Sequence, residues 1–199
     1  MKIIGLTGAT GAGKGVFGKN AVQKYNIMHI DTDLTARSVV EPGKPCLEEI
    51  EKEFGKQVIK ENGTLDRSTL GNIVFSDAQK LEVLNRITHH YITKEVRECL
   101  EKAKKDGFIA VIIDAPLLFE SGEDKLCDVT VGIIADKETR KQRIIARDAI
   151  SEEMAQKRLD SGKDTDFFAE RCDYLIENNS DETEFLKSCD MVLERILSF

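Results

Sequence analysis

Several features that would assign the chain to a special class of protein are missing from its sequence. It has no tryptophan and only three prolines, and its longest apolar run covers Phe108–Ile113. That run is far shorter than the roughly 20 residues needed to cross a bilayer. Met1 and Lys2 lead directly into a strand-like segment, so no signal peptide is expected. The sequence therefore indicates a soluble protein without a membrane anchor.

Cysteine usage and net charge narrow the class further. The five cysteines form no CxxC pair, and an odd number does not suit a disulfide framework or a zinc ribbon. Reduced thiols and a cytoplasmic location are expected. The formal charge of −7 argues against a protein that mainly coats nucleic acid, although a few arginines and lysines suffice to bind a small anion. We expect small-molecule substrates, and no protein partner is indicated.

The chain has 199 residues, of which 41% are hydrophobic and 33% charged, enough to form a core and remain soluble. Five short apolar runs lack the alternation of half-exposed strands and are separated by segments with helical periodicity. These runs are Lys2–Leu6, Met28–Ile30, Ile109–Ile113, Val129–Ala135 and Tyr174–Ile176. The pattern predicts an α/β fold with a five-stranded parallel sheet and helices on both faces.

One interval between the predicted strands is too long for a simple crossover. Residues 40–107 contain no convincing strand, and an apolar stripe from Leu81 to Leu100 has helical spacing. We therefore predict a helical insertion at 41–107, within a core made of 1–40 and 108–199. A final helix is expected from about Ser180. Its predicted buried face consists of Phe185, Leu186, Cys189, Val192, Leu193 and Ile196.

The most specific motif is Gly8–Lys14, with the sequence GATGAGK, directly after the first predicted strand. It is the GxxxxGK part of a phosphate-binding loop (P-loop), in the strand–loop–helix context that this motif requires. Glycines let backbone N–H groups approach a phosphate, and the lysine adds a full positive charge. The alternative is a flexible glycine turn that happens to end in lysine. The candidate nucleotide-binding residues are Gly8, Thr10, Gly11, Ala12, Gly13, Lys14, Gly15 and Val16.

The residue after the lysine departs from the complete motif. Position 15 is glycine, whereas the full P-loop has a serine or threonine whose hydroxyl binds Mg²⁺. A water molecule, a carboxylate of Asp33 or Asp114, or the hydroxyl of Thr10 could replace it. Alternatively, the metal site is weak and catalysis is impaired.

Carboxylates follow two of the predicted strands. Asp31 and Asp33 follow the second strand, where a carboxylate can accept the proton of an attacking hydroxyl, or simply cap the next helix. Asp114 ends the third strand, where it can hold Mg²⁺ through water, or form a turn before Pro116. Asp33 and Asp114 are the candidate metal ligands. The adjacent His89 and His90 point to different sides of a helix, which does not favour a metal site.

Several separate blocks of sequence resemble the dephospho-CoA kinase family, in order and with compatible spacing, from Lys2 to about Asn178. These blocks are Asp31–Arg37, Val39–Gly43, Gly63–Arg67, Leu70–Gly71, Val74–Phe75, His89, Asp114–Glu120, Arg143, Arg147–Asp148, Ser151–Leu159 and Asp173–Asn178. The resemblance implies a P-loop kinase with a helical substrate domain and a lid at about 138–165. It also implies that ATP and Mg²⁺ phosphorylate the ribose 3′-hydroxyl of dephospho-CoA, the last step of coenzyme A synthesis.

The resemblance also assigns roles to individual residues. Asp33 matches the general base and Lys14 the phosphate-binding lysine, and Arg147 completes the candidate catalytic set. Arg143 and Arg147 occupy lid positions that face the nucleotide. Asp33, Arg37, Arg67, His89 and Leu117 are the candidate substrate-binding residues. Arginine forks suit a transferring phosphoryl group, but each of these arginines alone could equally lie on a solvated helix face.

Departures from the family pattern leave other functions open. Besides Gly15, His90 stands where the family usually has proline, and Ser161 and Gly162 stand where it usually has glutamine. A related P-loop kinase acting on another nucleoside or nucleotide is one alternative. A nucleotide-binding regulator with impaired catalysis is the other, and Gly15 motivates it.

Overall fold

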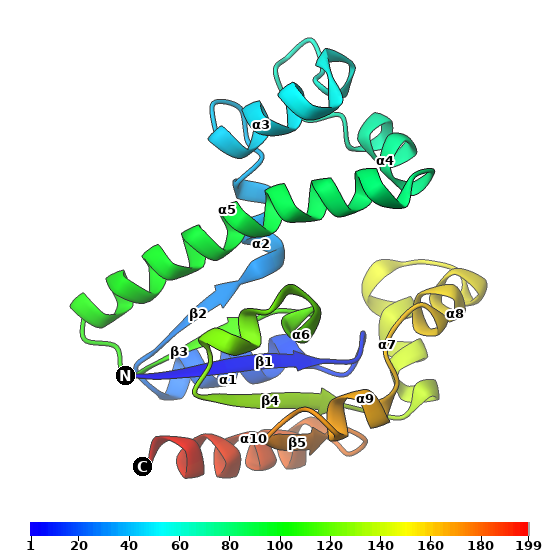
Figure 1. The fold of residues 1–199 in the computed structure, drawn as a ribbon. Helices are drawn as coiled ribbons and strands as arrows, with labels where there is room; N and C mark the ends of the chain where they lie inside the picture. The colour runs from blue at the N-terminus through cyan, green and yellow to red at the C-terminus, as the bar shows by residue number, and fades with distance from the viewer. Residues whose placement is uncertain (199) are drawn as a thin grey trace. The chain divides into compact units, whose positions relative to one another are not determined.

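Five strands form one sheet in the computed structural model, which describes residues 1–198. The strands are β1 (Lys2–Gly8), β2 (Ile27–Asp31), β3 (Ala110–Asp114), β4 (Val129–Ile134) and β5 (Tyr174–Glu177), as labelled in Figure 1. Their order across the sheet is β2-β3-β1-β4-β5, and the sheet is parallel. All five predicted strands and the predicted α/β class are confirmed, with strand ends shifted by one or two residues.

The register places the carboxyl ends of the central strands side by side. Leu6 of β1 is opposite Asp114 of β3, and Gly8 of β1 is opposite Ile133 of β4. The chain then leaves β1 into the GATGAGK segment and enters α1 (Lys14–Lys24). The predicted P-loop thus lies at the carboxyl edge of the sheet, where parallel α/β proteins bind ligands.

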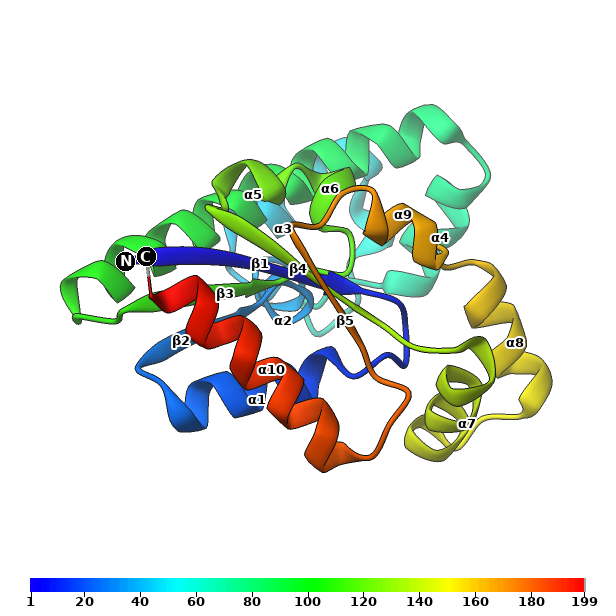
Figure 2. The same cartoon turned by 90° about the horizontal axis from the view of Figure 1, so that it is seen from below.

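Helices cover both faces of this sheet. Helices α1 and α10 (Glu182–Leu197) lie on one face, as Figure 2 shows, and pack against alternate residues of β1 such as Ile4 and Leu6. On the other face, α6 (Leu118–Ser121) approaches Gly5 of β1 so closely that a side chain there would strike Leu118. The predicted final helix is confirmed: Asp181 caps it, and Phe185, Cys189, Leu193 and Ile196 are buried, whereas Leu186 and Val192 of the predicted face are only partly buried.

The chain divides into two compact units. Unit 1 contains Met1–Ile30 and Ala103–Phe199, and unit 2 contains Asp31–Lys102. Unit 2 is helical, with one isolated bridge between Ile59 and Leu65. Its helices are α2 (Thr32–Ser38), α3 (Pro45–Phe54), α4 (Arg67–Phe75) and most of α5 (Ala78–Lys105), with a 3₁₀ turn at Lys56–Val58. The apolar stripe of α5 supplies Ile87, Ile92, Val96 and Leu100 to the buried residues.

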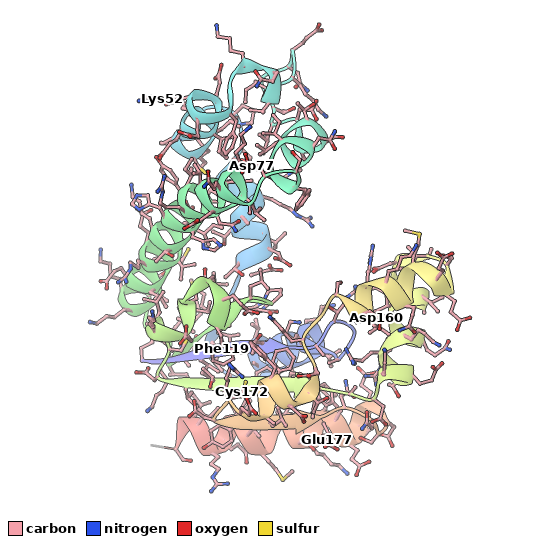
Figure 3. All side chains as sticks on the ribbon, turned by 45° about the vertical axis from the view of Figure 1, so that its right-hand side comes forward. Lys52, Asp77, Phe119, Asp160, Cys172 and Glu177 are labelled. Carbon is pink, nitrogen blue, oxygen red and sulfur yellow. The ribbon has the colours of Figure 1, made fainter. Side chains whose placement is uncertain are left out.

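Unit 1 also contains a pair of packed helices after β4. Helix α7 (Lys137–Asp148) ends at Ala149, whose left-handed φ of 50° reverses the chain, and α8 (Glu152–Asp160) returns along it. Ile144, Ala155 and Leu159 form a small core between them. Asp160, labelled in Figure 3, lies at the end of α8. It accepts a 2.7 Å hydrogen bond from Lys137 of α7. The short helix α9 (Thr165–Ala169) leads to β5, and a 3₁₀ turn at Glu123–Leu126 precedes β4.

Candidate active site

The P-loop has the compact shape expected of a phosphate cradle. The N–H of Ala9 donates to the carbonyl of Ile133 (3.1 Å), and the N–H of Ala12 donates back to the carbonyl of Ala9 (3.0 Å). The Lys14 ammonium donates to the carbonyl of Gly8 across the mouth of the loop (3.1 Å). The first turn of α1 carries no acidic residue, so the positive end of its dipole is not opposed locally.

Three glycines of the loop have positive φ, at Gly8 (141°), Gly11 (81°) and Gly13 (110°). Their lack of a side chain is also required by neighbouring parts of unit 1. A Cβ atom at Gly8 would strike the backbone of Ile133, and one at Gly11 would lie 2.8 Å from the Arg140 carbonyl. The glycine pattern therefore permits tight packing of the loop onto β4 and α7, in addition to any contact with phosphate.

Gly15 differs from these loop glycines. It is helical and exposed, and a Cβ atom built there would meet no atom within 4 Å. Packing therefore does not demand glycine at this position. Thr10 is also exposed, whereas Ala12 is buried and Val16 is partly buried against the core. Position 15 therefore lacks the hydroxyl of the complete motif although unit 1 has room for a side chain there.

Asp114 lies next to the P-loop strand, at the carboxyl end of β3. The N–H of Ala115 donates to the Leu6 carbonyl (3.0 Å), which holds this strand end against β1. Oδ2 of Asp114 lies 3.5 Å from Nε2 of His29 on β2, an atom that is buried and has no other polar partner among residues 1–198. Asp114 is thus a mostly buried carboxylate placed where phosphates of a bound nucleotide are expected.

In unit 2 the two aspartates after β2 have different structural roles. Asp31 caps α2, because its Oδ1 accepts hydrogen bonds from the N–H groups of Asp33 (2.9 Å) and Leu34 (3.1 Å). The capping alternative is therefore realised by Asp31. Asp33 stands in the first helical turn, exposed, where a carboxylate is favoured by the helix dipole.

The other predicted substrate-binding residues of unit 2 lie on three helices. Arg37 is in the last turn of α2, Arg67 is the first residue of α4, and His89 is in the middle of α5. Within the described part of the chain, no hydrogen bond or ion pair joins them. His89 lines a hollow of about 560 Å³ on α5. That hollow is also lined by Arg86, His90, Thr93, Lys94, Arg97 and Glu98.

The predicted lid arginines are already engaged within unit 1. Arg147 makes two hydrogen bonds to Asp148, from Nε (2.8 Å) and Nη2 (3.0 Å), and Arg158 pairs with the same carboxylate. The hydrogen bond from Arg147 holds the pKa of Asp148 below its ordinary value. Arg143 instead donates to Asn178 at the end of β5.

Asn178 also lies in this site, although it is not among the candidate site residues predicted from the sequence. Its Nδ2 donates to the carbonyl of Ala12 in the P-loop (2.8 Å), and the side chain is only 5% exposed. The sequence feature that could have pointed to Asn178 is its place directly after the last buried strand. A polar residue there lies at the same sheet edge as the P-loop. Leu117, from the predicted substrate set, precedes α6 and is exposed.

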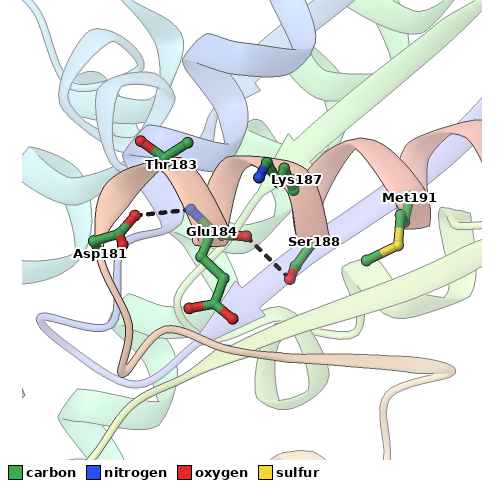
Figure 4. Close-up of a pocket in the computed structure, with 6 residues that line it drawn as sticks. All are labelled: Asp181, Thr183, Glu184, Lys187, Ser188 and Met191. Carbon is green, nitrogen blue, oxygen red and sulfur yellow. Dashed lines mark hydrogen bonds between the residues drawn. The ribbon is translucent and has the colours of Figure 1, made fainter.

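A second hollow of unit 1 lies apart from the predicted site. A hollow of about 440 Å³ lies along α10, where Asp181 accepts from the Glu184 N–H and Ser188 donates to the Glu184 carbonyl (Figure 4). None of the predicted site residues lines it. Across residues 1–198, no three His, Cys, Asp or Glu side chains come together as a metal site, and no helix is long and apolar enough to cross a membrane.

Comparisons of the sequence and of the structure with known proteins point to the same family. A family model described as dephospho-CoA kinase matches residues 2–184. A dephospho-CoA kinase of Listeria monocytogenes is 36% identical over 196 residues, which cover 98% of this chain and 98% of the relative. A solved dephospho-CoA kinase of Campylobacter jejuni has a TM-score of 0.72 at 28% identity, covering 98% of this chain and 97% of that one. A Thermus thermophilus structure reaches a TM-score of 0.81 at the same identity and coverage.

Proposed function

The chain belongs to the dephospho-CoA kinase family, and from this premise we propose that it transfers the γ-phosphoryl group of ATP to the ribose 3′-hydroxyl of dephospho-CoA. The products are coenzyme A and ADP. The observation that carries the proposal is the P-loop of unit 1, whose backbone bonds and Lys14 form a phosphate cradle in a chain that matches this family almost from end to end. We expect a cytoplasmic enzyme that acts on small molecules.

We assign the two halves of the reaction to the two units. Unit 1 is the nucleotide core, with the P-loop from Gly8 to Val16 around the phosphates and α7–α8 as the lid. Unit 2 is the acceptor domain, with Arg37, Arg67 and His89 as candidate contacts of dephospho-CoA, and Leu117 of unit 1 is a further candidate. Cations on α5 support this assignment, because Arg86, Lys94 and Arg97 make no ion pair within residues 1–198 and remain available to an anion.

In the proposed reaction, the 3′-hydroxyl oxygen attacks the γ-phosphorus, and the bond from that phosphorus to the β–γ bridging oxygen breaks. The hydroxyl proton passes to the carboxylate of Asp33. Negative charge develops on the departing ADP and on the transferred group, and the Lys14 ammonium offsets it. The arginine forks of the lid suit the same charge because they donate two parallel hydrogen bonds.

Arg147 can reach a nucleotide only by giving up or sharing its bonds with Asp148. The Arg147 side chain is exposed, whereas the Asp148 carboxylate is partly buried. If Arg147 turns to a phosphate oxygen, Asp148 keeps Arg158 as its partner. Arg143 is more restrained, because it donates to both the backbone and the side chain of Asn178.

The carboxylate of Asp114, at the carboxyl end of β3, suits Mg²⁺, which usually keeps several waters and takes one or two carboxylates together with substrate phosphates. Asp114 is the residue of unit 1 that we propose to hold the metal, through its carboxylate or through water, with Asp33 as the second candidate. The metal supplies charge neutralisation of the phosphates. Gly15 offers no hydroxyl, so a water molecule would have to supply the oxygen ligand that the hydroxyl provides in the complete motif.

The test is ADP release from ATP and Mg²⁺ with dephospho-CoA as acceptor, beside a panel of nucleosides and nucleoside monophosphates, with the product mass measured. Lys14→Ala serves as the control for contaminating kinases. Acceptor-dependent turnover with dephospho-CoA that falls sharply in Lys14→Ala supports the proposal. Turnover with another acceptor only would mean that the substrate is not dephospho-CoA. Nucleotide binding without any turnover would favour a regulator.

A further inference from the structure

A buried asparagine joins three separate parts of unit 1. Nδ2 of Asn178 donates to the Ala12 carbonyl of the P-loop (2.8 Å), while its Oδ1 accepts from Nη2 of Arg143 on α7 (3.2 Å). Nη1 of Arg143 also donates to the backbone carbonyl of Asn178 (3.0 Å). The backbone of Asn178 is itself fixed, because its N–H donates to Ile134 at the end of β4 (2.9 Å). We propose that Asn178 is a positioning residue that aims the P-loop N–H of Gly13 at the nucleotide phosphates.

The argument rests on the geometry of one peptide group. The carbonyl of Ala12 and the N–H of Gly13 belong to the same planar peptide, and in a trans peptide they point in opposite directions. A donor that holds the carbonyl on one side therefore fixes the direction of the N–H on the other. Gly13 has a φ of 110°, where a glycine peptide has several alternatives, so an outside restraint is needed to select one orientation.

The chemistry of the partners determines which way the amide points. The Ala12 carbonyl can only accept and the Arg143 guanidinium can only donate, so Nδ2 must face the loop and Oδ1 must face the arginine. Asparagine is a short side chain that carries a donor and an acceptor on two separate atoms. Gly13 leaves room for it, since a Cβ atom at position 13 would collide with Nδ2 of Asn178.

The same contacts tie the P-loop to α7. Gly11 packs against the Arg140 carbonyl of α7, and Arg143, one turn further along, holds Asn178. Arg143 thus acts on the loop through Asn178, which is a different role from direct contact with the nucleotide. We therefore expect a movement of α7 to shift the peptide group of Gly13 through Arg143 and Asn178.

The variant Asn178→Asp removes one of the two side-chain hydrogen bonds of Asn178 and keeps the other. Aspartate keeps an oxygen for Arg143 but loses the donor to Ala12 and sets a carboxylate against a carbonyl. We expect mant-ADP, titrated by fluorescence with and without MgCl₂, to bind about 10- to 100-fold more weakly, as expected for a buried acceptor left without its donor. The KM for ATP should rise with little change in the KM for dephospho-CoA. Binding within twofold of wild type would overturn the inference.

Asn179→Asp is the matched control, because Oδ1 of Asn179 accepts a hydrogen bond from the Asp136 N–H (2.8 Å) and aspartate retains that acceptor. Its affinity should equal that of the wild type. Thermal melts identify a variant that does not fold. In that case Asn178→Ser, which keeps a shorter donor, is titrated instead and should bind more weakly than wild type, whereas unchanged binding would overturn the inference.

A double-mutant cycle tests the path through Arg143. If Arg143 acts through Asn178, Arg143→Gln should weaken mant-ADP binding in the wild-type background and have little further effect in Asn178→Ala. Additive losses would overturn this part.

The inference rests on the proposed function only for its nucleotide. Normal mant-ADP binding with no turnover of dephospho-CoA would refute the proposed acceptor and leave the Asn178 test valid. A wild-type chain that binds no mant-ADP would overturn both.

Discussion

Gly18 on α1 lies directly against the imidazole ring of His29 on β2. A Cβ atom at position 18 would be 3.0 Å from Nε2 and 3.1 Å from Cε1 of His29. The same Nε2 is the atom that lies 3.5 Å from Asp114 on β3. A contact chain therefore runs from the P-loop helix, through His29, to the carboxylate proposed to hold the metal.

We predict that Gly18→Ala and Gly15→Ala have opposite effects on stability. Both positions are helical, and alanine in a helix is favoured over glycine by about 0.5–1 kcal/mol. Gly15 has open space around its Cα, so its variant should gain about that amount. At Gly18 the added methyl presses on a ring held between α1 and Asp114, and crowding of this kind costs about 1–3 kcal/mol.

Urea unfolding of the two variants beside wild type measures the difference directly. The midpoint of Gly15→Ala should rise and that of Gly18→Ala should fall, with unchanged slopes. Equal stabilisation by the two substitutions would mean that His29 moves aside at no cost.

The fold could be predicted from the sequence because local patterns determine most of it. Five apolar runs, each leading into glycine or a polar residue, predict a buried parallel sheet, and GATGAGK in a strand-to-helix junction predicts the loop and α1. Roles that depend on distant partners could not be predicted. Asp148, for example, binds Arg147 and Arg158 at once only because Ala149 reverses the chain between α7 and α8.

The same limit applies to Asn178 and Asp31. Asn178 is 166 residues from Ala12 in sequence, and no spacing rule links them. Asp31 and Asp33 are both compatible with a helix cap, and the choice depends on whether α2 starts at residue 32 or two residues later. Sequence patterns thus predict elements and motifs more securely than they predict side-chain partners.

Lys14→Ala should remove most of the catalysis while leaving the fold intact. The ammonium is held at the mouth of the loop by the Gly8 carbonyl, and its loss removes the one full charge on the P-loop. We expect kcat to fall by about 10²–10³-fold, the scale of a lost electrostatic stabiliser. Lys19→Ala, an exposed lysine on the same helix, is the control and should retain activity. Comparable losses in both variants would assign the effect to general charge.

Asp33→Asn tests the proposed general base. The amide has nearly the same shape, and Asp31 still caps α2, so nucleotide binding should stay close to wild type. Turnover should fall by about 10²–10⁴-fold, the usual contribution of general base catalysis. Glu48→Gln, the same change of group at an exposed position of α3, should leave turnover unaltered. Normal steady-state turnover of Asp33→Asn would refute the assignment.

Asp190 on α10 should make stability depend on acid pH. Burial alone would raise the pKa of Asp190, but hydrogen bonds from Lys24 and Asn20 outweigh burial and hold it below its ordinary value. Because the folded pKa is depressed, this contribution is present above the unfolded value of about 3.9 and is lost as the pH falls through the folded pKa. Asp190→Asn should be less stable than wild type at pH 7, and the difference should shrink towards pH 3. A constant difference would show that the charge of Asp190 is irrelevant.

Gly15→Ser restores the hydroxyl that the complete P-loop motif contains, at a position with room to accept it. If waters occupy the corresponding metal position in the native chain, the serine should lower the Mg²⁺ concentration needed for half-maximal activity or raise turnover. Gly15→Ala is the matched control, because it makes a similar change to helix propensity without adding a ligand. Mg²⁺ titrations at fixed ATP, repeated as binding of a nonhydrolysable ATP analogue, compare the two variants. Identical Mg²⁺ dependence in serine and alanine variants would mean that the metal site is already complete without this hydroxyl, and Gly15 would then lose its standing as a reason to suspect impaired catalysis.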